Sequence, residues 1–335
     1  MKNRVIYYDL LKVISIFAVI IMHIIGNTIN TFNLNGFSKE IYNFICIICY
    51  FAVPIFVMVS GGIFLNPNKK IEINNIIKKY CLRILLCLFI FGFVYSMLEI
   101  YFNTKTLNLE MILESIKNII TGNLWAHMWY LYLIFGLYLL TPIFRIITKN
   151  VNEKEYKYLL ILLFIFTILI NDINSILNLN IAFNILIYSP YVLLYFLGDY
   201  SNRYEIKENI KKVIYLSSFI SIIIIFLNNF FNLFSFYNFS YTCLLVFNII
   251  LSIFIFIKDR KIKLNKFIIS ISECSLGIYL IHQLIINIIF KLLKVDIILD
   301  YPYICLVIYV LITFIISYVI TYLLRKINLI NKYIL

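Results

Sequence analysis

The segment Asp9–Ile24, DLLKVISIFAVIIMHI, decides how the chain can fold, because it is long and almost wholly apolar. Three polar residues interrupt it: Asp9, Lys12 and His23. An α-helix turns by about 100° per residue, so eleven positions bring His23 back to within roughly 20° of Lys12. Asp9 lies three residues before Lys12, on the same side, so the pattern predicts one polar stripe along an apolar helix. A charge or an imidazole facing lipid is costly, so we expect this stripe to face a bundle interior or a water-filled cavity.

The composition is that of an integral membrane protein. Hydrophobic residues make up 63% and charged residues 13% of the 335 residues, whereas soluble domains contain roughly 45–50% and 25%. The length allows about ten membrane-spanning segments of around 20 residues joined by short connections. All of them should be helices, because lipid cannot satisfy open backbone groups. The expected fold is therefore an all-α integral membrane protein with a bundle of about ten transmembrane helices.

The apolar segments predict where these spans lie. Their approximate bounds are residues 10–30, 41–65, 81–102, 128–147, 157–172, 182–199, 213–230, 240–257, 267–291 and 303–323. The first apolar run continues without a small-residue cleavage site, so we interpret it as a span and not as a signal peptide. Between the third and fourth spans, residues 103–127 contain the helical pattern LNLEMILESIKNII, which is typical of a helix lying along the membrane interface.

The basic residues predict the orientation in the membrane. All but five of the 29 Lys and Arg fall on one side of this topology, the exceptions being Lys39, Lys105, Lys117, Lys291 and Lys294. By the positive-inside rule, both termini are expected in the cytoplasm and the protein in the cytoplasmic membrane. Topology, with a contribution from binding to anionic membrane lipids, therefore accounts for the net charge of +13. No nucleic-acid partner is expected.

Only three histidines occur in the chain, His23, His127 and His282, and none falls in a predicted cytoplasmic segment. A neutral imidazole deep in a cavity could act as general base toward an alcohol. Each could instead be a packed histidine bonded to a neighbouring helix. That alternative is least favoured for His23, because Asp9 and Lys12 share its face. No histidine pair has close metal-ligand spacing and no HExxH is present, so no metal site is expected.

A set of cations marks the predicted cytoplasmic end. Lys12 belongs to it, together with Lys79 and Arg83, which are four residues apart and thus on one helix face. Ordinary positive-inside flanking explains any one of these residues. Because Lys12 and Arg83 lie inside apolar runs, an anionic ligand reached from the cytoplasm, such as a phosphate group, is the alternative.

Five patches of the sequence resemble the membrane acyltransferase 3 family. In YYDLLKVISIFAVIIMH, an aspartate is followed by a basic residue, ten further residues and a histidine, as in the first helix of that family. The other patches are VPIFVMVSGGIFL, KKYCLRIL, HMWYLYLIFGLYLLTPI and SLGIYLIHQLI. They follow the family's order over nearly the whole chain. Two positions depart from it: Lys12 replaces the commoner Arg, and Lys79 accompanies Arg83 where two arginines are common. Lysine keeps the charge but loses the bidentate fork of arginine.

This resemblance implies a single transmembrane acyltransferase domain over residues 1–335, without an attached soluble esterase-like domain. The implied reaction transfers an acyl group, often acetyl, from cytoplasmic acyl-CoA to a hydroxyl of a cell-envelope carbohydrate or glycolipid. By the same resemblance His23 is catalytic, while Lys12, Lys79 and Arg83 bind the acyl donor. Acetyl-CoA or another acyl-CoA would be a substrate, and no permanently bound cofactor is expected.

Other polar residues would support this site. We expect His127 and Trp129 to lie on the acceptor side, where an aromatic face suits a pyranose ring, and His282 to have a supporting role. Asp9 and Glu273 would orient polar partners, or Asp9 would pair with Lys12 and ease the burial of both charges.

Two other functions are compatible with parts of the pattern. A transporter or flippase for a lipid-linked sugar would also contain a polar cavity. Such proteins usually show repeats, broken helices and several intramembrane carboxylates, whereas embedded polar residues are few here. A membrane scaffold would not explain why Asp9, Lys12 and His23 share one helix face.

Overall fold

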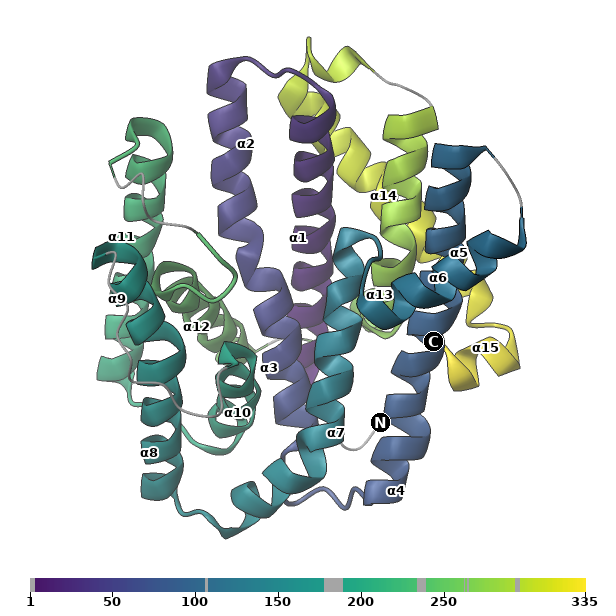
Figure 1. The fold of residues 1–335 in the computed structure, drawn as a ribbon. Helices are drawn as coiled ribbons and strands as arrows, with labels where there is room; N and C mark the ends of the chain where they lie inside the picture. The colour runs from purple at the N-terminus through teal and green to yellow at the C-terminus, as the bar shows by residue number, and fades with distance from the viewer. Residues whose placement is uncertain are drawn as a thin grey trace. The chain divides into compact units, whose positions relative to one another are not determined.

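The computed structural model describes residues 4–105, 108–177, 189–233, 239–261, 263, 265–292 and 296–335. Within these ranges every regular element is a helix (Figure 1). Helices satisfy their own backbone hydrogen bonds, which lipid requires of a spanning segment. The prediction of an all-α protein is confirmed.

Eight helical stretches of the described chain are long and apolar enough to cross a membrane. Several combine a helix with an adjoining 3₁₀ or π turn, and the shortest, of 23 residues, extends over roughly 35 Å at 1.5 Å per residue. The stretches are α1 (Ile6–Thr31), α2 (Gly36–Ile48) with α3 (Ala52–Phe64), α4 (Ile73–Asn75) with α5 (Leu82–Thr104), α7 (Trp129–Asn150), α8 (Glu153–Phe164) with α9 (Ile170–Leu177), α11 (Glu208–Phe231), α13 (Lys266–Asn287) and α14 (Pro302–Leu324).

Two further predicted spans correspond to shorter helices. These are α10 (Pro190–Arg203) and α12 (Leu244–Lys258), with 14 and 15 residues. Their lengths of roughly 21–23 Å fall short of a hydrocarbon core of about 30 Å. The first part of the predicted span 182–199 lies outside the described residues. A total of about ten spans, with both termini in the cytoplasm, therefore stays a prediction.

The chain forms two compact units, which we describe separately. The first contains Met1–Asn66 and Asn150–Val319, and the second contains Pro67–Lys149 and Ile320–Leu335. In the first unit α1 packs against α3, α12 and α13, and α3 packs against α10. In the second unit α5 packs against α6 (Leu109–Thr121) and α15 (Asn328–Tyr333).

Glycines allow α3 and α10 to cross closely. A Cβ atom added to Gly61 would lie 1.8 Å from the backbone oxygen of Tyr195, and one added to Gly198 would lie 1.8 Å from that of Met58. Small residues at such a crossing let two backbones approach, a common device where helices associate in membranes. Gly61 belongs to the patch VPIFVMVSGGIFL, so the α3–α10 crossing gives this patch a structural role.

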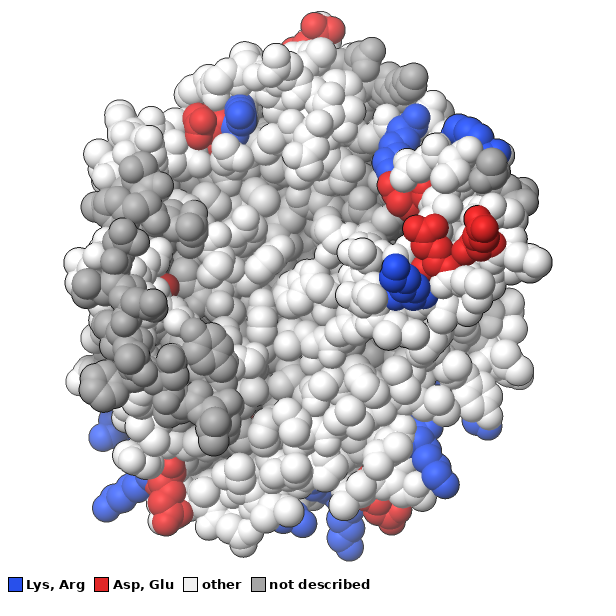
Figure 2. All heavy atoms as spheres, viewed as in Figure 1, with Lys and Arg blue, Asp and Glu red and all other residues white. Residues whose placement is uncertain are grey.

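The surface of α14 carries the side chains expected of a helix that faces lipid. Most of the surface visible in Figure 2 bears no charged residue. The large exposed apolar side chains of α14 include Ile304, Val307, Ile308, Leu311, Ile312 and Ile315. Water would penalise this much exposed apolar surface, whereas lipid tails would not. The arrangement is that of a multi-pass membrane protein.

Candidate functional site

A cluster of ionic hydrogen bonds joins the starts of α1 and α13. The Asp9 carboxylate accepts hydrogen bonds from Arg4 Nε at 2.7 Å, from Arg4 Nη2 at 2.9 Å and from Ser272 Oγ at 2.6 Å. Arg4 Nη1 donates to Glu273 Oε1 at 2.7 Å. The hydrogen bond to Asp9 is the largest effect on the pKa of Arg4 and raises it. Partial burial lowers this pKa, but by less. The guanidinium therefore stays charged.

This cluster corrects the expected pairing of Asp9 with Lys12. Arg4 takes the place of Lys12, because a guanidinium binds both carboxylate oxygens at once and a lysine ammonium does not. Lys12 is partly buried on α1, and within the described part of the chain it has no hydrogen bond or ion pair.

His23 and His282 lie side by side. Their ring centroids are 5.1 Å apart and the ring planes are tilted by 51°. His282 is fully buried and His23 partly buried. His23 lies roughly 21 Å along α1 from Asp9. Since the starts of α1 and α13 also meet, the two helices run parallel. The polar stripe on α1 thus faces α13 at two levels, at Asp9 and at His23, in the interior of the first unit.

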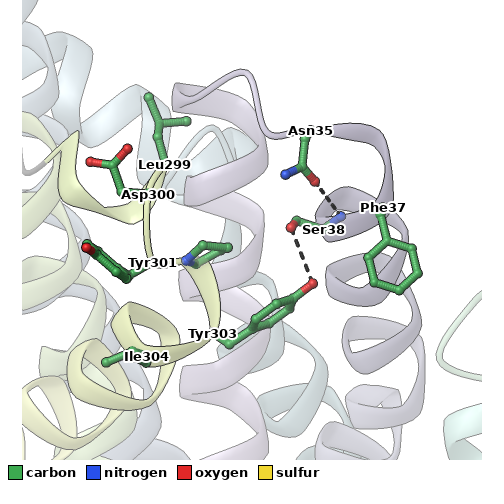
Figure 3. Close-up of a pocket in the computed structure, with 9 residues that line it drawn as sticks. Asn35, Phe37, Ser38, Leu299, Asp300, Tyr301, Tyr303 and Ile304 are labelled. Atoms are coloured by element: carbon green, nitrogen blue, oxygen red, sulfur yellow. Dashed lines mark hydrogen bonds between the residues drawn. The ribbon is translucent and has the colours of Figure 1, made fainter.

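A pocket of about 560 Å³ in the same unit lies between the start of α2 and residues 299–304, around the start of α14 (Figure 3). Asn35 Oδ1 caps α2 by accepting from Ser38 N at 2.8 Å, and the hydroxyls of Ser38 and Tyr303 lie 3.3 Å apart. Tyr42 ties α2 to the start of α14 through a 2.6 Å hydrogen bond to the carbonyl of Pro302. The pocket is lined by Asn35, Phe37, Ser38, Leu299, Asp300, Tyr301, Pro302, Tyr303 and Ile304.

The other two predicted donor-binding cations belong to the second unit. Lys79 is exposed in a π-helical turn and lies over the ring of Tyr80, with 5.5 Å from Nζ to the ring centroid. Arg83 Nη2 donates to the carbonyls of Asn331 at 3.3 Å and Lys332 at 3.2 Å, and so helps to hold α15 on α5. The grouping of Lys79 and Arg83 with Lys12 stays a prediction.

His127 is buried in an aromatic cluster of the second unit. The Tyr95 ring lies 5.7 Å from that of His127 and stacks on Trp125 at 4.2 Å, nearly parallel. Trp125 Nε1 donates to Glu99 Oε2 at 3.1 Å. The tryptophan stacked in this cluster is thus Trp125, while Trp129 is partly buried at the start of α7. A pocket of about 380 Å³ beside Trp125 is lined by Ser96, Glu99, Ile100, Asn103, Glu114, Asn118, Asn123 and Leu124.

A comparison with known families identifies the protein class. A family model described as an acyltransferase domain matches residues 5–325, nearly the full chain. The chain belongs to the membrane acyltransferase 3 family. Comparisons with curated proteins and with solved structures found no match. Family membership makes the protein a membrane acyltransferase and indicates a carbohydrate-type acceptor.

The structure of this acyltransferase adds residues that sequence reasoning missed. The sequence indicates Arg4 only as one of the basic residues that flank the first span. Ser272 lies near the start of the ninth predicted span, at a level comparable to that of Asp9 in the first span, and this match is the signal that could have found it. His282, which the sequence analysis expects to have a supporting role, lies beside His23. Trp125 lies two residues before His127. Among the described residues, no group of three or more His, Cys, Asp or Glu could hold a metal ion.

Proposed function

We propose that this acyltransferase moves an acyl group, acetyl being the expected one, from cytoplasmic acyl-CoA to a hydroxyl of a cell-envelope carbohydrate or glycolipid. His23 is the general base. The observation that carries this proposal is the position of His23 on α1: it faces the interior beside a fully buried histidine, on the helix that also presents Lys12. A protected but reachable imidazole suits proton abstraction from an alcohol.

The proposed reaction needs one proton acceptor. His23 takes the proton of the acceptor hydroxyl as its oxygen attacks the thioester carbonyl carbon. The carbon–sulfur bond then breaks, and coenzyme A leaves as a thiolate that takes the proton from the His23 imidazolium. The products are an ester and the thiol of coenzyme A, and the imidazole returns to its neutral form.

Lys12 supports binding of the donor. It lies roughly 16 Å before His23 along α1, and the flexible pantetheine arm of acyl-CoA separates the phosphate groups from the thioester. The phosphates could therefore contact Lys12 while the thioester reaches toward His23. The availability of Lys12 depends on Arg4, which neutralises the Asp9 carboxylate. Lys79 and Arg83 are proposed as further phosphate contacts.

The pocket in Figure 3 is the proposed acceptor site in the first unit. The rings of Tyr301 and Tyr303 suit the apolar face of a pyranose, and the Asp300 carboxylate and Asn35 amide suit its hydroxyls. His23 lies roughly 12 Å before the end of α1, so an acceptor longer than one sugar would be needed to reach from this pocket to His23. His127 and Trp129, with the polar pocket beside Trp125, are the proposed acceptor contacts of the second unit.

The test uses membranes containing the full-length protein and labelled acetyl-CoA. His23→Ala should lower label transfer by about 10²- to 10⁴-fold, the usual contribution of a general base. Lys12→Ala should raise the KM for acetyl-CoA. The matched control Lys266→Ala, which removes an exposed cation near the start of α13, should not. Normal transfer by His23→Ala at equal protein level would disprove the mechanism.

A transporter or flippase remains the rival function, and family membership favours acyl transfer over it. Binding of coenzyme A separates the two. Coenzyme A should raise the melting temperature of the purified acyltransferase and should not stabilise a sugar transporter. Mass spectrometry of envelope glycans from a deletion strain and its parent would then identify the acceptor.

A further inference from the structure

We propose that the short helix α15 is an autoinhibitory element that competes with the acyl donor for Arg83. Carbonyls in the last turn of α15 bind the Arg83 guanidinium, and a phosphate group of acyl-CoA must displace them in order to bind there. This inference rests on the proposed function, in which Arg83 contacts a phosphate of the donor. All the residues concerned belong to the second unit.

The contact between Arg83 and α15 uses only neutral acceptors. Arg83 Nη2 donates to the carbonyls of Asn331 at 3.3 Å and Lys332 at 3.2 Å. Both lie near the end of α15 (Asn328–Tyr333), where the last carbonyls have no helical partner and form the negative end of the helix dipole. Arg83 forms no ion pair with any described residue, and its Nε is buried without a hydrogen-bond partner.

A phosphate group would bind this guanidinium better than the carbonyls do. Pairs of arginine with phosphate are frequently bidentate, with hydrogen bonds of about 2.7–2.9 Å and the attraction of opposite charges in addition. The two bonds to α15 are longer and both start from one nitrogen, while Nε has no partner. The site at Arg83 is therefore occupied by a weaker acceptor than the one the donor offers.

The contacts of α15 are few enough for it to be displaced. The helix has only six residues, and none of them is buried. An isolated helix of this length is unstable in water, so its order depends on contacts with the rest of the unit. Besides the bonds from Arg83, these contacts include a 3.2 Å hydrogen bond from Cys87 Sγ to the carbonyl of Ile334 and the burial of Leu335. Segments with so few buried contacts open locally at a small cost in free energy.

Competition for Arg83 has two linked consequences. While α15 is docked, Arg83 is not free for a phosphate, so the apparent affinity for the donor is reduced by the fraction of molecules in the docked state. The coupling is reciprocal, so bound donor must loosen α15 by the same factor by which α15 weakens donor binding. Donor affinity and the order of α15 can therefore be measured independently.

Hydrogen exchange measures the release of α15 without catalysis. The amides of Ile334 and Leu335 both donate to the carbonyl of Ile330, at 2.8 and 2.9 Å. Coenzyme A should speed their exchange in the full-length protein in detergent, while the amide of Asn123, hydrogen-bonded in the same unit, should keep its rate. In Arg83→Ala, coenzyme A should no longer change the exchange of these amides. Unchanged or slower exchange when coenzyme A is bound would overturn the proposal.

Kinetics provide the second readout. Lys332→Pro removes a helical hydrogen bond and should melt α15. It should lower the KM for acetyl-CoA by about 2- to 5-fold, which corresponds to the usual strength of a cation at a helix C-terminus, with kcat unchanged. Asn328→Pro is the matched control, because proline is tolerated at the first position of a helix. Lys332→Ala removes the same charge and keeps the helix. Both controls should leave KM unchanged.

The outcomes separate this inference from the proposed function. A higher KM in Lys332→Pro would mean that α15 positions Arg83 for the donor, and an unchanged KM would mean that α15 takes no part in binding; either result overturns autoinhibition while acyl transfer by the parent protein stands. In the Arg83→Ala background, Lys332→Pro should have no further effect on KM. If coenzyme A does not raise the melting temperature of the protein, the donor assigned in the proposed function is wrong and the inference falls with it. A fully active His23→Ala would overturn the proposed mechanism and leave the competition at Arg83 intact.

Discussion

At the residue scale, the start of α1 shows which of two neighbouring basic residues binds the buried carboxylate of Asp9. Two basic residues, Arg4 and Lys12, flank one buried carboxylate. The guanidinium of Arg4 donates two hydrogen bonds to the Asp9 carboxylate, and the Ser272 hydroxyl donates a third. A buried carboxylate with three donors has most of its lost hydration replaced. Lys12 lies outside this cluster, and its predicted role in binding the acyl donor stays a prediction.

Asp9→Ala should destabilise the protein. Arg4 would lose its bidentate partner and Ser272 its acceptor, at a cost of about 1–3 kcal/mol, moderated by the partial exposure of Arg4. The midpoint of thermal unfolding in detergent measures this. Asp300→Ala, which removes an exposed carboxylate, is the matched control. In a double-mutant cycle Asp9→Ala and Arg4→Met should be strongly coupled, and additive effects would contradict the pairing.

The pKa of Arg4 determines the pH range over which its pair with Asp9 contributes to stability. The raised pKa of Arg4 means that its charge contributes to stability at every pH below the ordinary arginine value and is lost only above the raised one. Deprotonation of Arg4 therefore does not break the cluster around neutral pH.

At the element scale, the close approach of α3 and α10 depends on two glycines. The Cβ positions of Gly61 and Gly198 are each occupied by backbone of the other helix. Backbone atoms cannot rotate away as a flexible side chain can. Any larger residue must therefore push the helices apart and weaken the packing along their length.

Gly61→Ala should cost at least about 2 kcal/mol of stability and lower the yield of folded protein. Gly26→Ala is the matched control in the same unit, because nothing lies within 4 Å of its Cβ position. Removing this helical glycine should be neutral or stabilising by up to about 1 kcal/mol. Size-exclusion chromatography after heating to a series of temperatures gives the melting temperature of each variant. Equal melting temperatures for both variants would refute the close crossing.

The helix predicted within residues 103–127 is confirmed as α6, and its three faces differ in character. The buried face consists of Met111, Ser115 and Ile119. The exposed apolar face consists of Leu109, Leu113, Ile116 and Ile120. The charged face consists of Glu110, Glu114 and Lys117. One face packs on α5, and the other two suit lipid and water respectively. This is the pattern of a helix lying in the membrane interface, whose location there stays a prediction.

At the scale of the whole molecule, the first unit has a charged end and an end near the histidine pair. Arg203 donates to the carbonyl of Leu65 at 3.1 Å, and Lys211 pairs with Asp259 at 2.5 Å. These contacts join helix ends that the predicted topology places in the cytoplasm, the side from which acyl-CoA would arrive. His23 lies nearer the other end of α1, on the side of the proposed acceptor pocket.

Reporter fusions test this polarity. Both termini are expected in the cytoplasm, so a C-terminal green fluorescent protein should fluoresce and a C-terminal alkaline phosphatase should be inactive. Alkaline phosphatase inserted between α1 and α2, at Asn33, should be active. The reverse pattern would place the basic ends outside and exclude a cytoplasmic donor at Lys12.

The sequence alone determined the membrane class, the helices, the polar stripe on the first span and the family. These follow from local properties, since apolar length and helical period are read within one segment. Tertiary structure decided the rest: Arg4 as the partner of Asp9, His282 beside His23, and Trp125 stacked in the cluster of His127. The contact of His23 with His282 joins two helices, whereas Arg4 and Trp125 lie outside helices, and all three contacts depend on side-chain reach and packing, which helical periodicity within a single segment does not specify.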